Sequence, residues 1–293
     1  LAAAGGGGGG YETGPRAAEL KALRHPGGEA GGEYPACKPA GKSSRWSCVR
    51  RFARDVCVQR HTNVPQATGG SYFGFSQKSG KWAKGSYEDR AFDWQQPKIP
   101  KIAKGPGFLV MNMTDALREK LLPWYATEVN KTGQLRQASL VPGGYMNDEY
   151  IKVDHLGIEK HPHLRNFVIR EMQEILEWWA DGAELKHTAM FGARVYRRGS
   201  VLLNHVDRMD THLVSAILQL HQEVDEDGGW PVEVLSEGGD CFEVYLQPGQ
   251  MVLYEGARYK HGRPMAFQGD AFANVFVHFA PTDWTGISNK KEL

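Results

Sequence analysis

The chain has 293 residues, of which 41% are hydrophobic and 24% are charged. That balance is typical of a globular protein and excludes a wholly disordered chain. Lysine and arginine together number 35 against 34 aspartates and glutamates, so the net charge is +1. A near-neutral chain gives no indication of a nucleic-acid partner, and the sequence contains no run of about 18 apolar residues that would predict a membrane span.

The N-terminal third is predicted to lie outside the main domain. Residues 1–35 contain the run Gly5–Gly10 and show no apolar periodicity, so we expect a flexible Gly-rich leader that cannot offset the entropy of ordering. Because the chain begins at Leu1, we expect a processed product or a fragment. Residues 36–105 are rich in Gly, Ser, Lys and aromatic side chains. We expect them to form an irregular extension that packs on the following domain.

The cysteines leave three interpretations open. Cys37, Cys48 and Cys57 lie close together, and Cys241 lies far along the chain. If the chain is secretory, a disulfide within the cluster is expected, with or without a second bridge to Cys241, and the sequence does not choose among the three full pairings. A zinc site is a weaker alternative because no Cys-x-x-Cys pair is present, although His61 follows the cluster. Free, buried cysteines are the third interpretation.

Two helices are predicted before the C-terminal region. Thr114 is a typical N-cap, and the helix that follows it is expected to bury leucines, until Pro123 kinks or ends it. A stronger apolar pattern, with steps of three and four residues, predicts a helix over 162–180 that closes at Gly182. The buried side chains expected in the two helices are Leu117, Leu121, Leu122, Leu164, Phe167, Val168, Met172, Ile175, Leu176 and Trp179.

After residue 185 the apolar period changes from helical to strand-like. Residues 232–234 and 242–246 alternate on either side of Gly238-Gly239-Asp240, which predicts a β-hairpin. Further strands are expected over 251–254 and 272–279. Several short strands with turn signals and no intervening helix are typical of a β-sandwich or jelly roll.

These elements together predict an α+β fold. Helices would buttress a C-terminal double-stranded β-helix, or jelly roll, whose core covers about 186–281 within a domain of 106–283. An irregular N-terminal extension would precede this domain, and residues 284–293 would form a short tail.

His205-Val206-Asp207 is the first part of a candidate metal site. Side chains at i and i+2 of a strand face the same side, so this imidazole and carboxylate can share one ion. His261, at the start of His261-Gly-Arg263-Pro, would supply the third ligand from a distant strand. Two histidines and one carboxylate leave about three metal positions open, which is the arrangement of non-haem Fe(II) oxygenases.

Residues 192–281 resemble the catalytic domain of prolyl 4-hydroxylase-type, 2-oxoglutarate- and Fe(II)-dependent dioxygenases. The resemblance covers roughly a third of the chain. The matching motifs are Tyr196-Arg-Arg-Gly199 before His205-Val-Asp207, the strand Leu213–Leu220 followed by Gly228-Gly229-Trp230-Pro231, the step from Pro248-Gly249 to Tyr254, and Gly269 eight residues after His261.

The resemblance implies both ligands and activity. It assigns His205, Asp207 and His261 as the ligands of Fe(II), with 2-oxoglutarate and O2 as cosubstrates and ascorbate as an auxiliary reductant. The implied reaction hydroxylates a residue of a protein or peptide substrate, with proline as the first expected target and succinate and CO2 as co-products. The alternative is a non-catalytic jelly-roll subunit with a structural or binding role in an assembly.

The chain departs from the family at the anchor for the distal 2-oxoglutarate carboxylate. The family has Lys or Arg nine or ten residues after the second histidine, where this chain has Asp270 and Ala271. We expect Arg263 to replace that cation, because strand parity turns it inward beside His261 and a guanidinium suits a carboxylate. Tyr196 and Ser215 stand where the family has a Tyr and a Thr that contact the same carboxylate.

The remaining polar residues are given ordinary roles. His212, His221 and His278 are expected to be structural or exposed rather than ligands, and Gly143–Asn147 is either a lid over the site or a surface loop.

The terminal Lys290–Leu293 resembles the K-D-E-L retrieval signal of the endoplasmic reticulum, and a plain charged tail is the alternative. We therefore expect the endoplasmic reticulum lumen or the secretory pathway.

Overall fold

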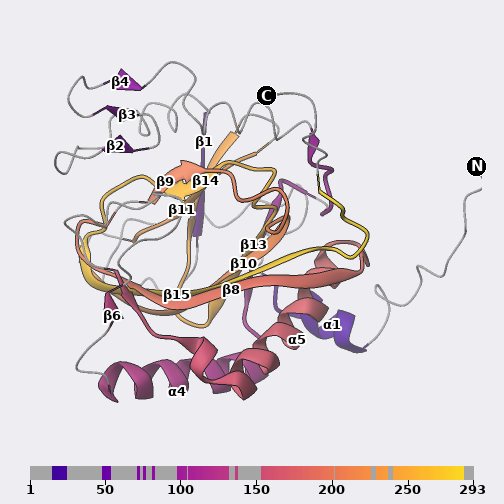
Figure 1. Ribbon diagram of the computed structural model, residues 1–293, viewed down its shortest axis with the longest axis horizontal. Helices are drawn as coiled ribbons and strands as arrows, with labels where there is room; N and C mark the ends of the chain where they lie inside the picture. Colours follow the sequence, from indigo (N-terminus) through magenta and orange to yellow (C-terminus); the bar gives the residue numbers. More distant parts are fainter. Residues whose placement is uncertain are drawn as a thin grey trace, which may run out of the picture.

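Two antiparallel sheets face each other and helices cover the outer face of the larger one (Figure 1). This computed structural model describes residues 15–24, 48–53, 71–72, 75–76, 81–82, 98–103, 105–131, 136–137, 153–200, 202–225, 229–236 and 240–286. The expected α+β jelly roll is confirmed.

The larger sheet contains seven strands and the smaller one five. In spatial order the larger sheet consists of β5 (Phe108–Asn112), β13 (Gln250–Tyr254), β10 (Val214–Val224), β15 (Gly269–Pro281), β8 (Leu185–Tyr196), β7 (Asp154–His155) and β6 (Arg136–Gln137). The smaller sheet consists of β1 (Cys48–Ala53), β12 (Asp240–Tyr245), β11 (Val232–Leu235), β14 (His261–Arg263) and β9 (Leu202–His205). A separate small sheet contains β2 (Ser71–Tyr72), β3 (Phe75–Ser76) and β4 (Lys81–Trp82).

The predicted β-hairpin is present as β11 and β12, in which Val232 pairs with Val244. Beyond it, β1 from the predicted extension adds an antiparallel strand to the edge of the smaller sheet. The extension therefore contributes to the jelly roll, while the domain boundaries drawn from the sequence stay predictions.

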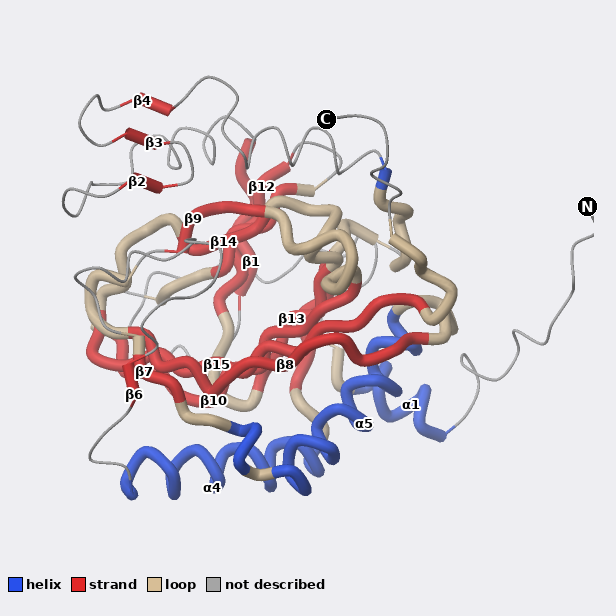
Figure 2. Tube along the Cα trace, in the orientation of Figure 1, coloured by secondary structure: helices blue, strands red, loops and turns tan. Residues whose placement is uncertain are grey.

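Helices α4 (Asp115–Lys131) and α5 (Pro162–Trp179) lie along the larger sheet, with the short 3-10 helix η2 (Ile158–Lys160) before α5 (Figure 2). The α5 range matches the predicted helix, and its buried stripe contains Val168, Met172, Ile175, Leu176 and Trp179. None of the described helices is both long enough and apolar enough to cross a lipid bilayer.

The larger sheet is buried on both faces. In β5, Leu109 and Met111 join the core against the helices, whereas Phe108 and Val110 join the core between the two sheets. A strand with two buried faces reads as a continuous apolar run, which is how Phe108–Met111 appears in the sequence.

Helix α4 begins as predicted but does not end as predicted. The Leu117 N–H donates to Thr114 Oγ1 over 3.2 Å, which confirms the N-cap. Pro123 lies inside the helix, which continues to Lys131. The expectation that Pro123 could end the helix is therefore wrong. Leu121 and Tyr125 are buried on either side of the proline, and their packing retains the helix despite the missing hydrogen bond.

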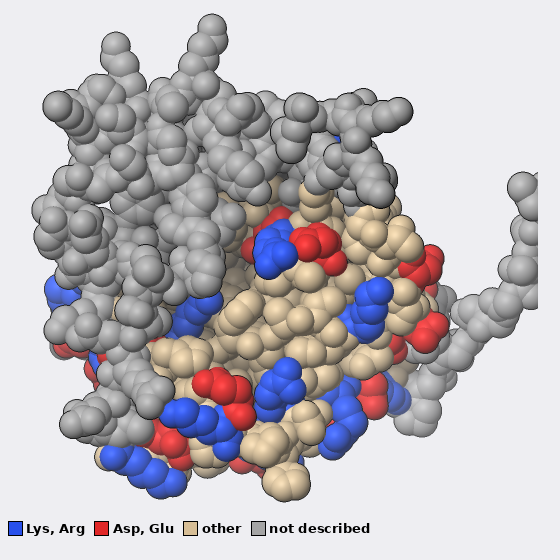
Figure 3. Space-filling model, in the orientation of Figure 1, with Lys and Arg blue, Asp and Glu red and all other residues tan. Residues whose placement is uncertain are grey.

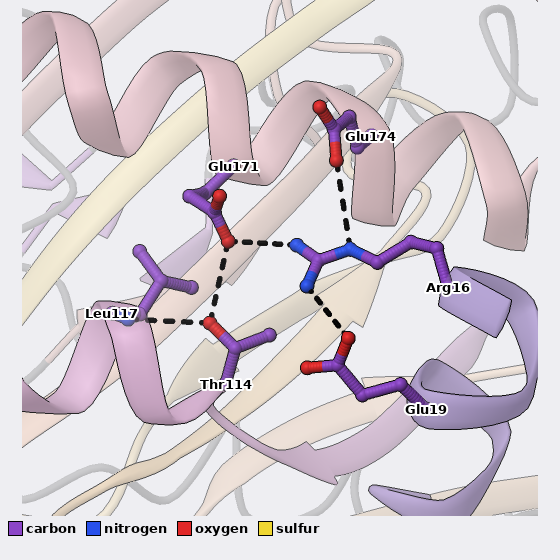
Figure 4. A network of polar contacts seen from close by, with 6 residues as sticks. All are labelled: Arg16, Glu19, Thr114, Leu117, Glu171 and Glu174. Atoms are coloured by element: carbon purple, nitrogen blue, oxygen red, sulfur yellow. Dashed lines mark hydrogen bonds and ion pairs between the residues drawn. The ribbon is translucent and has the colours of Figure 1, made fainter.

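Part of the predicted leader is ordered. Residues Pro15–Ala22 form helix α1, in which Ala17 and Leu20, three residues apart on one face, are buried. The expectation that residues 1–35 show no apolar periodicity is therefore wrong for the helical part of this range. Arg16 donates to Glu171 of α5 over 2.7 Å, and the same glutamate oxygen lies 3.4 Å from Thr114 Oγ1 (Figure 4). These contacts tie α1 to α5 and to the start of α4.

Cys241 on β12 is fully buried and disulfide-bonded. The other cysteines of the sequence are Cys37, Cys48 and Cys57. A free Cys241 is thus excluded.

The loop Gly143–Asn147 and the tail Lys290–Leu293 lie outside the described residues.

Candidate metal centre

The two candidate histidine ligands face each other across a pair of short strands. His205 ends β9, His261 begins β14, and the two are directly paired in the antiparallel ladder. Their ring centroids lie 4.6 Å apart and both residues are buried. Strand pairing thus brings together two histidines that are 56 positions apart in the sequence.

Asp207 reaches the same point from a loop, since β9 ends at His205. The Asp207 N–H donates to the Gly256 carbonyl over 2.9 Å, which fixes the backbone of this loop. Asp207 Oδ1 lies 3.6 Å from His205 Nε2, and Oδ2 lies 3.6 Å from His261 Nε2. The three ligand atoms all lie within 4.8 Å of one another.

This donor set fits one metal ion. Two atoms that bind the same ion at about 2 Å each lie at most about 4 Å apart, so both 3.6 Å separations suit a shared ion. The His261 Nδ1–H can donate to the Tyr259 carbonyl, 2.9 Å away, which leaves Nε2 with its lone pair toward the ion.

The protonation states also suit metal binding. Burial lowers the pKa of His261 to about 4, so its imidazole is neutral at physiological pH. Burial acts to raise the pKa of Asp207, but the neighbouring His261 and His205 outweigh it and hold this pKa well below its ordinary value. The site therefore offers two imidazoles and one ionised carboxylate.

Arg263 lies on the same short strand as His261 and is only 1% exposed. Its Nε donates to the Trp230 carbonyl over 3.2 Å, and its guanidinium carbon lies 5.0 Å from the Trp230 ring centroid and 5.1 Å from that of Phe272. Burial lowers the pKa of Arg263 to about 10, so the side chain is still charged at neutral pH. Strand parity correctly predicted its inward position.

Two buried polar atoms beside Arg263 have no hydrogen-bond partner in the described structure: its own Nη1 and the Tyr196 hydroxyl. A buried cation without an anion is strongly unfavourable. The residues present therefore fit an incoming carboxylate, which would accept from both atoms. Ser215 is also buried, but its Oγ lies 2.8 Å from His278 Nδ1 and so already has a partner.

Tyr254 and His278 belong to the site although sequence reasoning gave neither of them a role in it. Ser215 pairs with Tyr254 on one side and with His278 on the other. The Tyr254 ring centroid lies 4.6 Å from that of His261. Burial, followed by the nearby Asp207, raises the pKa of Tyr254 well above its ordinary value, so the hydroxyl keeps its proton.

The other histidines are placed as expected. His278 is buried and stacks on His212 with ring centroids 3.7 Å apart, while His221 lies at the surface and stacks on Tyr125. None of them joins the metal cluster found among the described residues. Asp270, at the family's usual anchor position, is exposed and pairs with Arg198.

Comparison with known proteins finds no matching family model and no matching curated protein. Several solved structures are similar to this chain. A prolyl-4-hydroxylase from Pseudomonas putida is 16% identical over 60% of this chain and 92% of its own, with a TM-score of 0.46. A prolyl hydroxylase from Trichoplax adhaerens, in complex with a hypoxia inducible factor peptide fragment, is 13% identical over 65% and 90%, with a TM-score of 0.45.

HygX from Streptomyces hygroscopicus, with nickel, 2-oxoglutarate and hygromycin B bound, is 12% identical over 65% of this chain and 88% of its own, with a TM-score of 0.40. Solved structures similar to this chain thus include a prolyl 4-hydroxylase and other 2-oxoglutarate/Fe(II) oxygenases.

Proposed function

We propose that this chain is an Fe(II)- and 2-oxoglutarate-dependent dioxygenase that hydroxylates a residue of a peptide or protein, with proline as the first candidate. The proposal rests on two residues of one strand, a candidate metal ligand and a buried arginine. His261 joins the metal-binding group, and Arg263, two residues later, ends in a buried guanidinium nitrogen with no hydrogen-bond partner among the described residues. A dicarboxylate could meet the metal with one end and Arg263 with the other.

The chain's own residues would bind and orient both groups. Bound Fe(II) and 2-oxoglutarate would supply the oxidative chemistry, with O2 as the oxidant and succinate and CO2 as co-products. His205, Asp207 and His261 would hold the ion, while Arg263 and Tyr196 would donate to the distal carboxylate of 2-oxoglutarate. Ascorbate would act only as an auxiliary reductant.

Aromatic side chains would keep water from the bound cosubstrate. Trp230 lies 4.9 Å from Tyr196, 5.3 Å from Phe267 and 5.4 Å from Phe272, as measured between ring centroids. All four rings are buried. A charge-assisted hydrogen bond from Arg263 gains strength in such surroundings because the local dielectric constant is low.

The alternative, a non-catalytic jelly-roll subunit, is less well supported. A structural core gains nothing from a buried guanidinium nitrogen and a buried tyrosine hydroxyl that both lack hydrogen-bond partners in the described part of the chain, since each costs free energy unless a ligand meets it. Apolar residues of similar volume would stabilise such a core better.

The test is conversion of 2-oxoglutarate to succinate by the purified chain with Fe(II), ascorbate and O2, in the presence of proline-containing peptides. We expect succinate formation by the parent and by Asp210→Ala, and none above background by Asp207→Ala. Asp210 is a matched control because it is exposed and pairs with Arg208. If the parent forms no succinate under any of these conditions, the dioxygenase proposal fails.

We further propose that the protein works in an oxidising compartment such as the secretory pathway. The disulfide at Cys241 supports this, because such bonds persist mainly where thiols are not kept reduced. Alkylation of the protein unfolded without reductant should leave Cys241 unmodified, because unfolding exposes a free thiol but not a disulfide. Complete alkylation of Cys241 would contradict the proposal.

A further inference from the structure

A bulge in β8 turns two side chains toward the space between the sheets. Phe191 pairs with Phe276 and Arg194 pairs with Asn274, so three steps along β8 match two steps along β15. In a regular strand, residues three apart face opposite sides. The extra residue in β8 therefore places Phe191 and Arg194 on the same face, which is the face of Phe276 in the core between the sheets.

Gly192 lies within this bulge. Its φ is +125°, and a Cβ at this position would lie 2.8 Å from the Asn274 carbonyl oxygen. Both observations favour glycine there. Bulges of this kind are common next to active sites, where they redirect a side chain.

Arg194 is held by aromatic rings and by nothing else in the described structure. Its guanidinium carbon lies 5.2 Å from the Phe191 ring centroid and 5.3 Å from that of Phe276, which are cation–π distances. Arg194 is half-buried, and within the described ranges it makes no ion pair and no side-chain hydrogen bond. Its donors are thus oriented but unused.

The pair lies next to the candidate metal centre. The Phe191 ring centroid is 5.6 Å from that of His278, whose Nδ1 contacts Ser215. His278 also lies close enough to Asp207 and to Arg194 for their charges to affect it. Ring contacts therefore lead from His278, whose Nδ1 meets Ser215 of the site, to Phe191 and on to Arg194.

The Phe191 side chain is 37% exposed. It is one of only two large hydrophobic side chains that are exposed within the described residues. Figure 3 shows the molecule from the same side as Figure 1, and the described surface there is largely uncharged, with scattered Lys, Arg, Asp and Glu side chains. An arginine beside an exposed ring can discriminate between substrates by charge.

We propose that Arg194, supported by Phe191 and Phe276, selects a peptide substrate that carries an acidic residue close to the residue to be hydroxylated. A guanidinium offers two parallel N–H donors that match a carboxylate. The exposed face of Phe191 would contact the apolar part of the same peptide. This inference rests on the proposed function and adds a substrate class to it.

The test is peptide binding, measured by fluorescence anisotropy on the chain loaded with Mn(II) and 2-oxoglutarate without O2. The probes are labelled peptides with one proline in a Gly/Ala background and one Glu, moved from three residues before the proline to three residues after it. Matched peptides carry Gln or Lys instead of Glu. At one or more positions the parent should bind the Glu peptide about ten-fold more tightly than the Gln peptide.

Two variants and a control complete the experiment. Arg194→Gln should remove the preference for Glu, and Arg194→Glu should reverse it in favour of Lys, which a misfolded protein would not do. Arg118→Gln is the control, because Arg118 lies on α4 and pairs with Asp115; it should keep the preference. A parent with no preference at any position, or an Arg194→Gln variant that retains it, would overturn the inference.

Titration of the parent with Mn(II) and 2-oxoglutarate alone separates this inference from the proposed function. If the parent binds neither, the proposed function fails. If it binds both but shows no charge preference among the peptides, only the assignment of Arg194 fails.

Discussion

Gly256 packs directly against the carboxylate of Asp207: a Cβ at position 256 would lie 2.1 Å from Oδ2. Gly256→Ala must therefore displace the only anionic ligand of the three. We expect the dissociation constant for Mn(II) to rise by at least about ten-fold, measured by calorimetric titration, because a ligand moved by even a fraction of an ångström loses its geometry.

Gly157→Ala is the control for this prediction. A Cβ there would meet Glu159 Oε1 at 2.3 Å, but that atom is the end of an exposed side chain that can move away. Its Mn(II) affinity should match that of the parent. Equal affinities in Gly256→Ala and the parent would show that the position of Asp207 does not matter for metal binding.

Arg263→Ala should weaken 2-oxoglutarate binding without affecting the metal. We expect the dissociation constant to rise by about ten- to a few-hundred-fold, corresponding to roughly 1.5–3 kcal/mol for a charge-assisted hydrogen bond. Arg263→Lys should recover only part of this loss, since the ammonium group of lysine cannot form the bidentate hydrogen bond of a guanidinium. Competition titrations with 2-oxoglutarate on the Mn(II)-loaded protein measure both effects.

Arg118→Ala, which removes an exposed arginine on α4, serves as the comparison. It should bind 2-oxoglutarate as the parent does. If Arg263→Ala also binds like the parent, Arg263 is not the anchor and the distal carboxylate has another partner.

Glu255 should make stability depend on pH. Burial raises the pKa of its carboxyl from 4.5 to about 7, although Oε1 accepts the Ile102 N–H over 2.6 Å. Since the folded-state pKa lies above the ordinary value, the folded state binds the proton more tightly than the unfolded state. The resulting stabilisation is complete below pH 4.5 and is lost as the pH rises through 7.

We expect the difference in unfolding free energy between the parent and Glu255→Gln to change by about 3 kcal/mol between pH 4.5 and pH 8. Urea unfolding at a series of pH values measures it, and Glu19→Gln, at an exposed position, controls for charge removal. A constant difference between the parent and Glu255→Gln across this range would contradict the buried-carboxyl account.

The grouping of the three candidate metal ligands could be predicted because their spacing is local or follows a known motif. His205 and Asp207 are two residues apart, and Arg263 follows His261 by two on the same strand. Asp207 lies beyond the end of β9, however, so the loop contact with Gly256, rather than strand alternation, fixes its position.

Residues whose roles depend on strand pairing could not be predicted. Tyr254 and His278 are ordinary strand residues until the pairing of β10 with β13 and β15 brings both to Ser215. Arg194 and Phe191 share a face only because of the bulge at Gly192, which the sequence does not reveal. Helix α1 was missed because a single short apolar face, Ala17 and Leu20, is hidden in a Gly-rich stretch.

The most direct measurement for the central claim is an anaerobic titration of the metal-free protein with Fe(II), carried out on the parent and on His205→Ala, Asp207→Ala and Asp207→Asn. The account predicts one Fe(II) per parent chain, no stoichiometric binding in either alanine variant, and weakened binding in Asp207→Asn with the fold retained. Asp207→Asn removes the only negative charge among the ligands while keeping the side-chain shape. An alanine variant that binds one Fe(II) per chain with the affinity of the parent would contradict the assignment of His205, Asp207 and His261 as the iron site.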